Sequence, residues 1–322
     1  MSKIAFLFLT IDNVYYPQIW ERYFQECPLK KSIYVHPKYP EQVTVPWMKD
    51  HIIEDLVPTK WGHLTNAFYQ LLKAAFKDKM NTHVIFISDS CLPIRKLSTL
   101  DKYIHSYPRK TSFIHFKDNI DDYDWKKKIQ KVSGYQKYEL QKHEGLGNCV
   151  SRYHVDKLLK HQQDFTLFFN KLNCGDEYYL SLLGNEQFVH DQQMTFYNWT
   201  EGKKKIDILN QQMNTIYLQA EQKKILKINE DLKTLRANKL PGYQHKIRAL
   251  KVTLRRIGQG KNEHLLNAKQ RSDIKNLRIQ KSNLGKHPKE YQEISKFEIK
   301  KLRNQGFFFL RKISPDNFKF NF

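Results

Sequence analysis

The 322-residue chain has few of the features that stabilise very small or fibrous proteins. It contains four cysteines, Cys27, Cys91, Cys149 and Cys174, and no CxxC pair, which argues against a zinc cage and against a disulfide framework. With 12 Gly and 11 Pro, it is neither collagen-like nor of low complexity. No run approaches the roughly 20 apolar residues of a membrane-spanning helix. Hydrophobic residues nevertheless make up 40% of the chain and aromatic residues 13%, enough to form a buried core.

Several short motifs of nucleotide-binding and hydrolytic enzymes are also absent. There is no GxxxxGK[ST] or GxGxxG, so P-loop kinases and dinucleotide enzymes lose their main signal. There is no GxSxG, the usual nucleophile turn of α/β-hydrolases. The N-terminal segment MSKIAFLFLT is too short for a signal peptide and continues into polar sequence. We therefore expect a cytoplasmic protein whose contact with a membrane, if any, is peripheral.

Negative charge is scarce, and its shortage is local. Lys and Arg number 55 against 33 Asp and Glu, a net charge of +22. Residues 203–289 hold 22 basic and 6 acidic residues, so +16 of this charge lies in one segment. Apolar residues recur there at helical spacing on both sides of Pro241-Gly242, which predicts a basic helical insertion over residues 203–285. Two roles are open for such an insertion. It is either a solvent-exposed helical segment that covers part of the cleft for a second substrate, or an element that binds an anionic surface.

The remaining sequence alternates between strand and helix patterns. Short apolar runs at Ile4–Leu9, Ser32–His36 and Thr82–Ser88 predict strands, and helical spacing follows at Leu64–Phe76 and Leu97–Ile104. This alternation predicts an α/β fold with a mostly parallel sheet covered on both faces. Ligands bind such sheets beyond the carboxyl ends of the strands, which directs attention to the loops after Thr10, His36 and Ser88.

Two groups of charged residues are candidates for chemistry. Glu177 follows Asp176 at an expected helix start after Cys174-Gly175, and a carboxylate there could take a proton from a sugar hydroxyl. The alternative is that both acids only cap a helix. Near the C-terminus, Lys289 and the pair Arg311-Lys312 could hold a diphosphate and stabilise it as a leaving group. In a lysine-rich chain, the alternative is that these cations are solvated surface.

The sequence offers little that would bind a metal ion. The strand ending at Ser88 leads into Asp89-Ser90-Cys91, without the second carboxylate of an Asp-x-Asp metal motif. The nearest Asp-x-Asp, Asp122-Tyr123-Asp124, lies in a charged stretch that reads as a surface loop. We therefore expect no metal cofactor, while a metal-dependent enzyme that uses Asp122 and Asp124 stays as an alternative.

Taken together, several stretches resemble the core-2/I-branching family of glycosyltransferases, in particular its plant-type branch. The resemblance is spread over residues 4–202 and 286–318, in matching order and spacing. It is carried by Ala5–Thr10, Pro17–Phe24, Ser32–His36, Lys60-Trp61-Gly62-His63-Leu64, Phe86–Pro93, Asp176–Leu180, Asn198–Gly202, His287-Pro288-Lys289 and Phe309–Pro315.

The resemblance implies a GT-A-like fold, an inverting mechanism, a UDP-sugar donor, a glycan acceptor and no metal ion. It implies that Glu177 is the catalytic base and that Lys289 and Lys312, with Arg311 beside them, neutralise the donor diphosphate. Lys289 stands where the family has Arg, which keeps the charge but loses the bidentate fork. The implied nucleoside contacts are Thr10, Val35, His36, Ser88 and Asp89, and the implied acceptor-side residues are Trp61, Asp176 and Trp199.

The predicted organisation is therefore a catalytic domain made of residues 1–202 and 286–322, interrupted by the basic helical insertion, which has no counterpart in the family. The leading hypothesis is an inverting, metal-independent glycosyltransferase that transfers N-acetylglucosamine, or else glucose or xylose, from a UDP-sugar to a glycan hydroxyl. The rival hypothesis is a protein that binds nucleic acid or an anionic membrane through the insertion, with an inactive α/β domain; nucleic acid is not a partner under the leading hypothesis.

Overall fold

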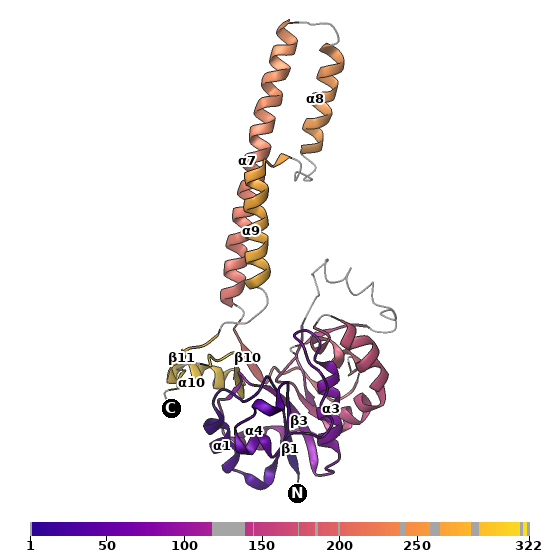
Figure 1. The fold of residues 1–322 in the computed structure, drawn as a ribbon, viewed down its shortest axis with the longest axis vertical. Coiled ribbons are helices and arrows are strands. Elements are labelled where there is room, and N and C mark those ends of the chain that lie inside the picture. The colour runs from indigo at the N-terminus through magenta and orange to yellow at the C-terminus, as the bar shows by residue number, and fades with distance from the viewer. Residues whose placement is uncertain are drawn as a thin grey trace. The chain divides into compact units, whose positions relative to one another are not determined.

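The structure, a computed structural model, describes residues 2–117, 139–143, 145–172, 174–183, 186–198, 200–238, 243–257, 265–284, 290–315 and 318–320. The chain divides into two compact units, residues 1–197 with 290–322, and residues 198–289. Figure 1 shows the sheets within the first unit and labels the helices α7, α8 and α9 of the second.

The first unit is built on a six-stranded sheet in the order β2-β1-β3-β8-β5-β9. The three longest strands, β2, β1 and β3, are parallel, whereas β8 is antiparallel to both β3 and β5. These observations confirm the predicted α/β class with its mostly parallel sheet. The strands are β1 (Lys3–Thr10), β2 (Lys31–Pro37), β3 (Asn81–Ser88), β5 (Ser112–Phe113), β8 (Cys149–Ser151) and β9 (Val189–His190).

The continuous apolar run of β1 is explained by burial on both of its faces. Residues 4–8 have no exposed surface, and alternate side chains belong to two different hydrophobic clusters. Ala5 and Leu7 pack with α3 and α6, whereas Phe6 and Phe8 pack with α1 and α4. Because side chains alternate across a strand, a strand covered on both sides has no polar positions. These helices are α1 (Pro17–Gln25), α3 (Thr65–Phe76), α4 (Leu97–His105) and α6 (Arg152–Leu158), and a short α2 (Pro46–Lys49) follows β2.

The C-terminal segment of the chain returns to the first unit. Strand β12 (Phe309–Arg311) lies between β10 (Thr195–Tyr197), to which it is parallel, and β4 (Leu92–Pro93), to which it is antiparallel. It is preceded by α10 (Lys296–Asn304), which begins with a capping box formed by Ser295 and Glu298. Two short pairs complete the unit: β6 (Phe116–Lys117) with β7 (Lys142–His143), and β11 (Glu293–Ile294) with β13 (Lys319–Phe320).

The second unit consists of α7 (Thr200–Asn238), α8 (Tyr243–Ile257) and α9 (Ala268–Leu284). Helix α8 packs against α7 through a cluster centred on Ile228, Leu232 and Ile257. Helix α9 packs against an earlier part of α7 through Ala220 and Ile274, joined by Leu266. Residues from both apolar patterns of the sequence therefore form contact faces between these helices, whose course is drawn in Figure 1. In the described ranges, no helix is both long and apolar enough to cross a bilayer.

The structure corrects the expected helix start at the acid pair. Asp176 and Glu177 lie in a 3₁₀ turn, Gly175–Glu177, instead of starting an α-helix. The turn is closed by i→i+3 bonds such as Glu177 N to Cys174 O at 2.9 Å. Cys174 has a positive φ of 60°, and Tyr178 and Tyr179 are almost fully buried just after the turn. The need to bury these rings therefore overrides the helical preference of the sequence.

Trp20 links the N-terminal sheet to the C-terminal strand, which leads to a stability prediction. Its ring is fully buried, lies 5.1 Å from the Phe8 ring and 6.1 Å from the Phe309 ring, and its Nε1 donates to Cys91 O at 3.2 Å. We expect Trp20→Ala to lower the free energy of unfolding by about 3–5 kcal/mol, because it leaves a cavity shared by three segments. Urea unfolding measures this effect.

Trp20→Phe keeps most of the ring volume and should lose clearly less stability than Trp20→Ala. Phe297→Ala, at a phenylalanine that is 77% exposed, is the control for removing an aromatic ring and should change stability little. Equal losses for Trp20→Ala and Phe297→Ala would contradict the role of Trp20 as a core residue.

Candidate functional site

The carboxyl ends of β1, β2 and β3 lie together and form one polar edge of the main sheet. Leu9 is in register with both His36 and Ser88, so the loops after these strands are neighbours. Ile11 N donates to Asp89 Oδ2 at 3.4 Å, and Thr10 O accepts from Lys38 N at 2.9 Å. The predicted nucleoside residues are therefore brought to one place by the parallel register.

Not all of these residues present a surface there. Val35 and His36 have no exposed surface; Val35 belongs to the hydrophobic core, and His36 Nε2 accepts from Val57 N at 3.1 Å. Burial lowers the pKa of His36, in keeping with this acceptor role. In this structure the side chains of Val35 and His36 pack inside the protein at the end of β2 and do not face a ligand. Thr10 and Ser88 are 6% and 4% exposed, so Asp89, which is partly exposed, is the most accessible of the five.

Arg311, the last residue of β12, is a half-buried positive charge next to this edge. It is in register with Tyr197, and its guanidinium carbon lies 5.5 Å from the centre of the Tyr197 ring. Its charge acts on two carboxyl groups, Asp89 and Asp176, and opposes the rise in their pKa values that burial causes. Burial alone would lower the pKa of Arg311, but Tyr197, Cys91 and Asp89 outweigh it, so its pKa is raised and it stays charged.

Lys312 extends from the same strand end and is tied to the end of β3. Ile313 N donates to Ser90 O at 3.1 Å, and Lys312 O accepts from Tyr291 N at 2.8 Å. The Lys312 ammonium lies 3.5 Å from Glu290 Oε1 and retains 27% side-chain exposure. The backbone bonds place a partly exposed cation beside Asp89, although the two residues are far apart in sequence.

The 3₁₀ turn Gly175–Glu177, here called the acid turn, is linked by a hydrogen bond to the loop that contains Trp61. Cys174 N donates to Gly62 O at 2.7 Å, and Gly62 directly follows Trp61, whose side chain is 56% exposed. Gly175 cannot be replaced without movement, because a Cβ there would lie 1.9 Å from the backbone oxygen of Phe169. This close approach fixes where the next two residues, both acids, project.

The two acids have different surroundings. Glu177 is 28% exposed and forms an ion pair with Lys142, with 2.7 Å between Oε2 and Nζ. Asp176 has a buried Oδ1 without a hydrogen-bond partner in the described part of the chain, and its Oδ2 would be 2.8 Å from a Cβ at Gly145. Burial, reinforced by the neighbouring charge of Glu177, raises the pKa of Asp176 to about 7. The pair thus combines a partly exposed side chain held by a lysine with a half-buried carboxyl group whose pKa is raised.

The structure brings together Asp89, Arg311, Lys312, Asp176 and, through the acid turn, Glu177 and Trp61. Three predicted residues or pairs, Lys289, Trp199 and Asp122 with Asp124, lie outside the described residues. In the described ranges, no three His, Cys, Asp or Glu side chains gather in a way that could hold a metal ion.

Sequence reasoning missed two residues of this site. Lys142, on β7, pairs with Glu177, and Tyr197, on β10, packs on Arg311 and donates from its hydroxyl to Leu146 O at 2.6 Å. A lysine in a chain this rich in lysine carries no signal of its own. Tyr197 directly precedes the matched stretch Asn198–Gly202, but its contact with Arg311 depends on the pairing of β10 with β12.

Comparison with known proteins gives two matches. The family model described as Core-2/I-Branching enzyme matches residues 4–216. A protein named Glycosyltransferase BC10 from Oryza sativa subsp. japonica is 27% identical over 121 residues, which are 35% of this chain. The match spans only 30% of the length of the rice protein.

The buried carboxyl group of Asp176 predicts a pH dependence of stability. Between the usual pKa of 3.8 and about 7, the unfolded chain releases the Asp176 proton while the folded chain keeps it. This group should therefore lower the free energy of unfolding as pH rises through that window, by up to about 1.4 kcal/mol per pH unit. Asp176→Asn removes this titration. Urea unfolding should therefore show the free energy of unfolding of the variant rising relative to that of the wild type from pH 4 to about 7, and the difference between the two should stay constant above that pH.

Asp156→Asn, at an exposed aspartate on α6, is the matched control and should follow the wild type across the same range. A difference between Asp176→Asn and the wild type that does not change with pH would contradict the assignment of a raised pKa to Asp176.

Proposed function

The chain belongs to the Core-2/I-Branching enzyme family, and from this premise we propose that it is a glycosyltransferase that moves a sugar from a UDP-sugar to a hydroxyl of a glycan acceptor with inversion. The observation that supports this most directly is the acid turn. It presents a partly exposed carboxylate, Glu177, beside the exposed Trp61 loop, while the cations Arg311 and Lys312 lie at the ends of the strands.

In the proposed reaction, Glu177 takes the proton of the acceptor hydroxyl as that oxygen attacks the anomeric carbon of the donor sugar. The bond between this carbon and the UDP oxygen breaks in the same displacement, so the configuration inverts. Lys142 holds one carboxylate oxygen of Glu177 at 2.7 Å and so orients the base. Because its pKa is raised to about 7, Asp176 is only partly ionised near neutral pH, so the turn does not carry two full negative charges.

We propose that protein cations, without a metal ion, absorb the charge of the departing UDP. Arg311 and Lys312 both act electrostatically on Asp89, at the position after β3 where a metal-binding carboxylate pair would otherwise stand. Lys289 would add a third cation, as the family pattern implies. Fixed positive charge of this kind stabilises a leaving group without reorganisation.

Among donor sugars, the family resemblance favours N-acetylglucosamine, with glucose and xylose as alternatives. The residues near the strand ends, Thr10, Ser88 and Asp89, are small or acidic and do not select one donor sugar. The loops that border them would determine which sugar binds. Assays with the three UDP-sugars separate the alternatives.

A second candidate function is suggested by the helical arm. Helix α8 contains five Lys or Arg residues and no acid, and Lys246, Arg248 and Lys251 are exposed. Like charges at helical spacing repel one another unless an anionic partner compensates them. The arm would then contact an anionic surface, whether or not the first unit transfers sugar.

The role of Glu177 is tested by Glu177→Gln. This variant keeps the side-chain volume but cannot accept a proton, so we expect turnover of the UDP-sugar to fall roughly a hundredfold or more while UDP binding is retained. Turnover of purified protein is measured in EDTA, and again with added manganese. Activity of the wild type that depends on manganese would contradict the proposal that no metal takes part.

Glu186→Gln is a closely matched control, because Glu186 also forms a lysine ion pair, with Lys157, and has 31% side-chain exposure. It should keep full turnover. If Glu177→Gln also keeps full turnover, Glu177 is not the base.

The anionic contact of the arm is tested with vesicles. Replacing Lys246, Arg248 and Lys251 together by Gln should weaken binding to vesicles containing phosphatidylglycerol by roughly a hundredfold at low salt, because each basic residue contributes about 1 kcal/mol. Sedimentation at increasing salt measures this. Removing Lys31, Lys49 and Lys102 in the first unit is the charge-matched control, and an equal loss there would show that net charge, not the arm, causes binding.

A further inference from the structure

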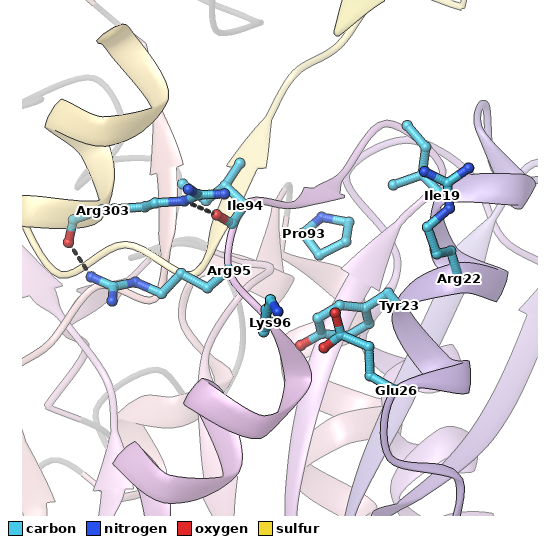
Figure 2. Close-up of a pocket in the computed structure, with 9 residues that line it drawn as sticks. All are labelled: Ile19, Arg22, Tyr23, Glu26, Pro93, Ile94, Arg95, Lys96 and Arg303. Atoms are coloured by element: carbon cyan, nitrogen blue, oxygen red, sulfur yellow. Dashed lines mark hydrogen bonds between the residues drawn. The ribbon is translucent and has the colours of Figure 1, made fainter. Parts of the chain in front are cut away.

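The first unit contains a pocket that shares no residue with the proposed site of sugar transfer. It has a volume of about 270 Å³ and lies between α1, the segment after β4, and α10. Neither the acid turn nor Asp89 or Lys312 lines it. Figure 2 shows its lining residues, with Arg95 and Arg303 on one side and Arg22 on the other.

The charges around this pocket are unbalanced. Four cations, Arg22, Arg95, Lys96 and Arg303, face one carboxylate, Glu26, a net charge of +3. Within the described residues, none of the four cations forms an ion pair. Glu26 is itself engaged, because its Oε2 accepts from Leu97 N at 3.2 Å at the start of α4. The pocket therefore has positive charge that the described protein groups leave uncompensated.

Two of these cations are held in fixed positions by backbone oxygens. Arg95 Nε donates to Phe307 O at 2.8 Å, a second Arg95 nitrogen donates to Arg303 O, and the guanidinium carbon lies 4.8 Å from the Phe308 ring centre. Arg303 Nε in turn donates to Ile94 O, as Figure 2 shows. Burial and the neighbouring charge of Arg303 lower the pKa of Arg95, so the two guanidinium groups repel each other where they are held. The terminal nitrogens of Arg303 have no partner in the described part of the chain, which leaves preorganised donors.

The rest of the lining is apolar. Tyr23, Pro93 and Ile94 are buried or nearly so, and Ile19 extends this surface along α1. A bare inorganic ion would use the cations but leave this surface unused. A ligand that fits the whole pocket has an anionic group and an apolar or ring-shaped body.

We propose that this pocket binds an organic phosphate monoester, whose phosphate oxygens pair with Arg95 and Arg303 and whose body contacts Tyr23 and Pro93. Arg22, on the other side of the pocket, attracts the anion at longer range. A monoester carries between one and two negative charges near neutral pH and matches the net charge of the pocket better than a single carboxylate does. Arginine forks are suited to phosphate oxygens. The monoester is either a free metabolite or the headgroup of a lipid such as phosphatidic acid. The inference does not rest on the proposed sugar transfer.

The test uses phenyl phosphate as the probe and isothermal titration calorimetry at constant ionic strength. We expect saturable binding that Arg95→Gln with Arg303→Gln weakens about a hundredfold or more, because each of the two charged hydrogen bonds contributes about 1.5–3 kcal/mol. Those two side chains also bond the backbone. Arg22→Gln, at an exposed residue, is therefore the variant that leaves the fold unperturbed, and it should weaken binding about threefold because it removes a longer-range attraction.

The controls separate this pocket from other cations. Lys49→Gln with Lys102→Gln removes the same charge from elsewhere in the first unit and should leave the affinity unchanged. The titration is repeated with excess UDP, which occupies the proposed donor site, and the affinity for phenyl phosphate should stay the same. Failure of the sugar-transfer proposal therefore does not affect this result. Phenyl phosphate binding that persists in both pocket variants, or that is absent in the wild type, overturns the proposal.

Two further comparisons define the ligand. Inorganic phosphate should bind more weakly than phenyl phosphate, and equal affinity overturns the role of Tyr23 and Pro93. Vesicles of phosphatidylcholine containing phosphatidic acid distinguish the sources. Cosedimentation that the pocket variants lose supports a lipid headgroup, whereas phenyl phosphate binding without cosedimentation supports a free phosphate ester.

Discussion

The half-buried charge of Arg311 is the constraint on which the candidate site depends. Its guanidinium acts on Asp89 at the end of β3 and on Asp176 in the acid turn, and it lies against Tyr197 on the neighbouring strand. A charge with little contact to water needs opposite charges nearby to compensate it. The position of β12 therefore decides whether carboxyl groups from two distant segments can both stay close to this guanidinium, and with them the arrangement of Glu177 and Lys312.

Much of the architecture could be predicted because it follows from strong local patterns. The apolar runs of β1 and β3 leave no polar face, so only a strand covered on both sides suits them, and the helical spacing of residues 64–76 appears as α3. The turns around Asp176 could not be predicted in the same way. There, the burial of Tyr178 and Tyr179 and the positive φ of Cys174 decide the local conformation, and both depend on partners elsewhere in the chain.

For the candidate site, the chain order of strands and the resemblance to a family located the strand ends, the acid turn and Arg311-Lys312. Neither the strand order nor the resemblance could predict the contacts and burial of the individual side chains. His36 is at a predicted strand end yet is fully buried, because the following loop folds back over β2 and Val57 N donates a hydrogen bond to the His36 ring. The partner of Glu177 is Lys142, one lysine among many, which only three-dimensional proximity distinguishes. Sequence thus indicated the location of the site better than the contacts within it.

The middle position of β12 in its small sheet also has a consequence for how the chain acquires its structure during synthesis. Strands β4 and β10 and the ring of Trp20 leave the ribosome long before Phe309, which completes their packing, and the whole helical arm is translated in between. Until β12 emerges, the nascent first unit exposes an apolar edge. Chaperone binding during translation should therefore concentrate on the interval between the end of β10 and the release of β12.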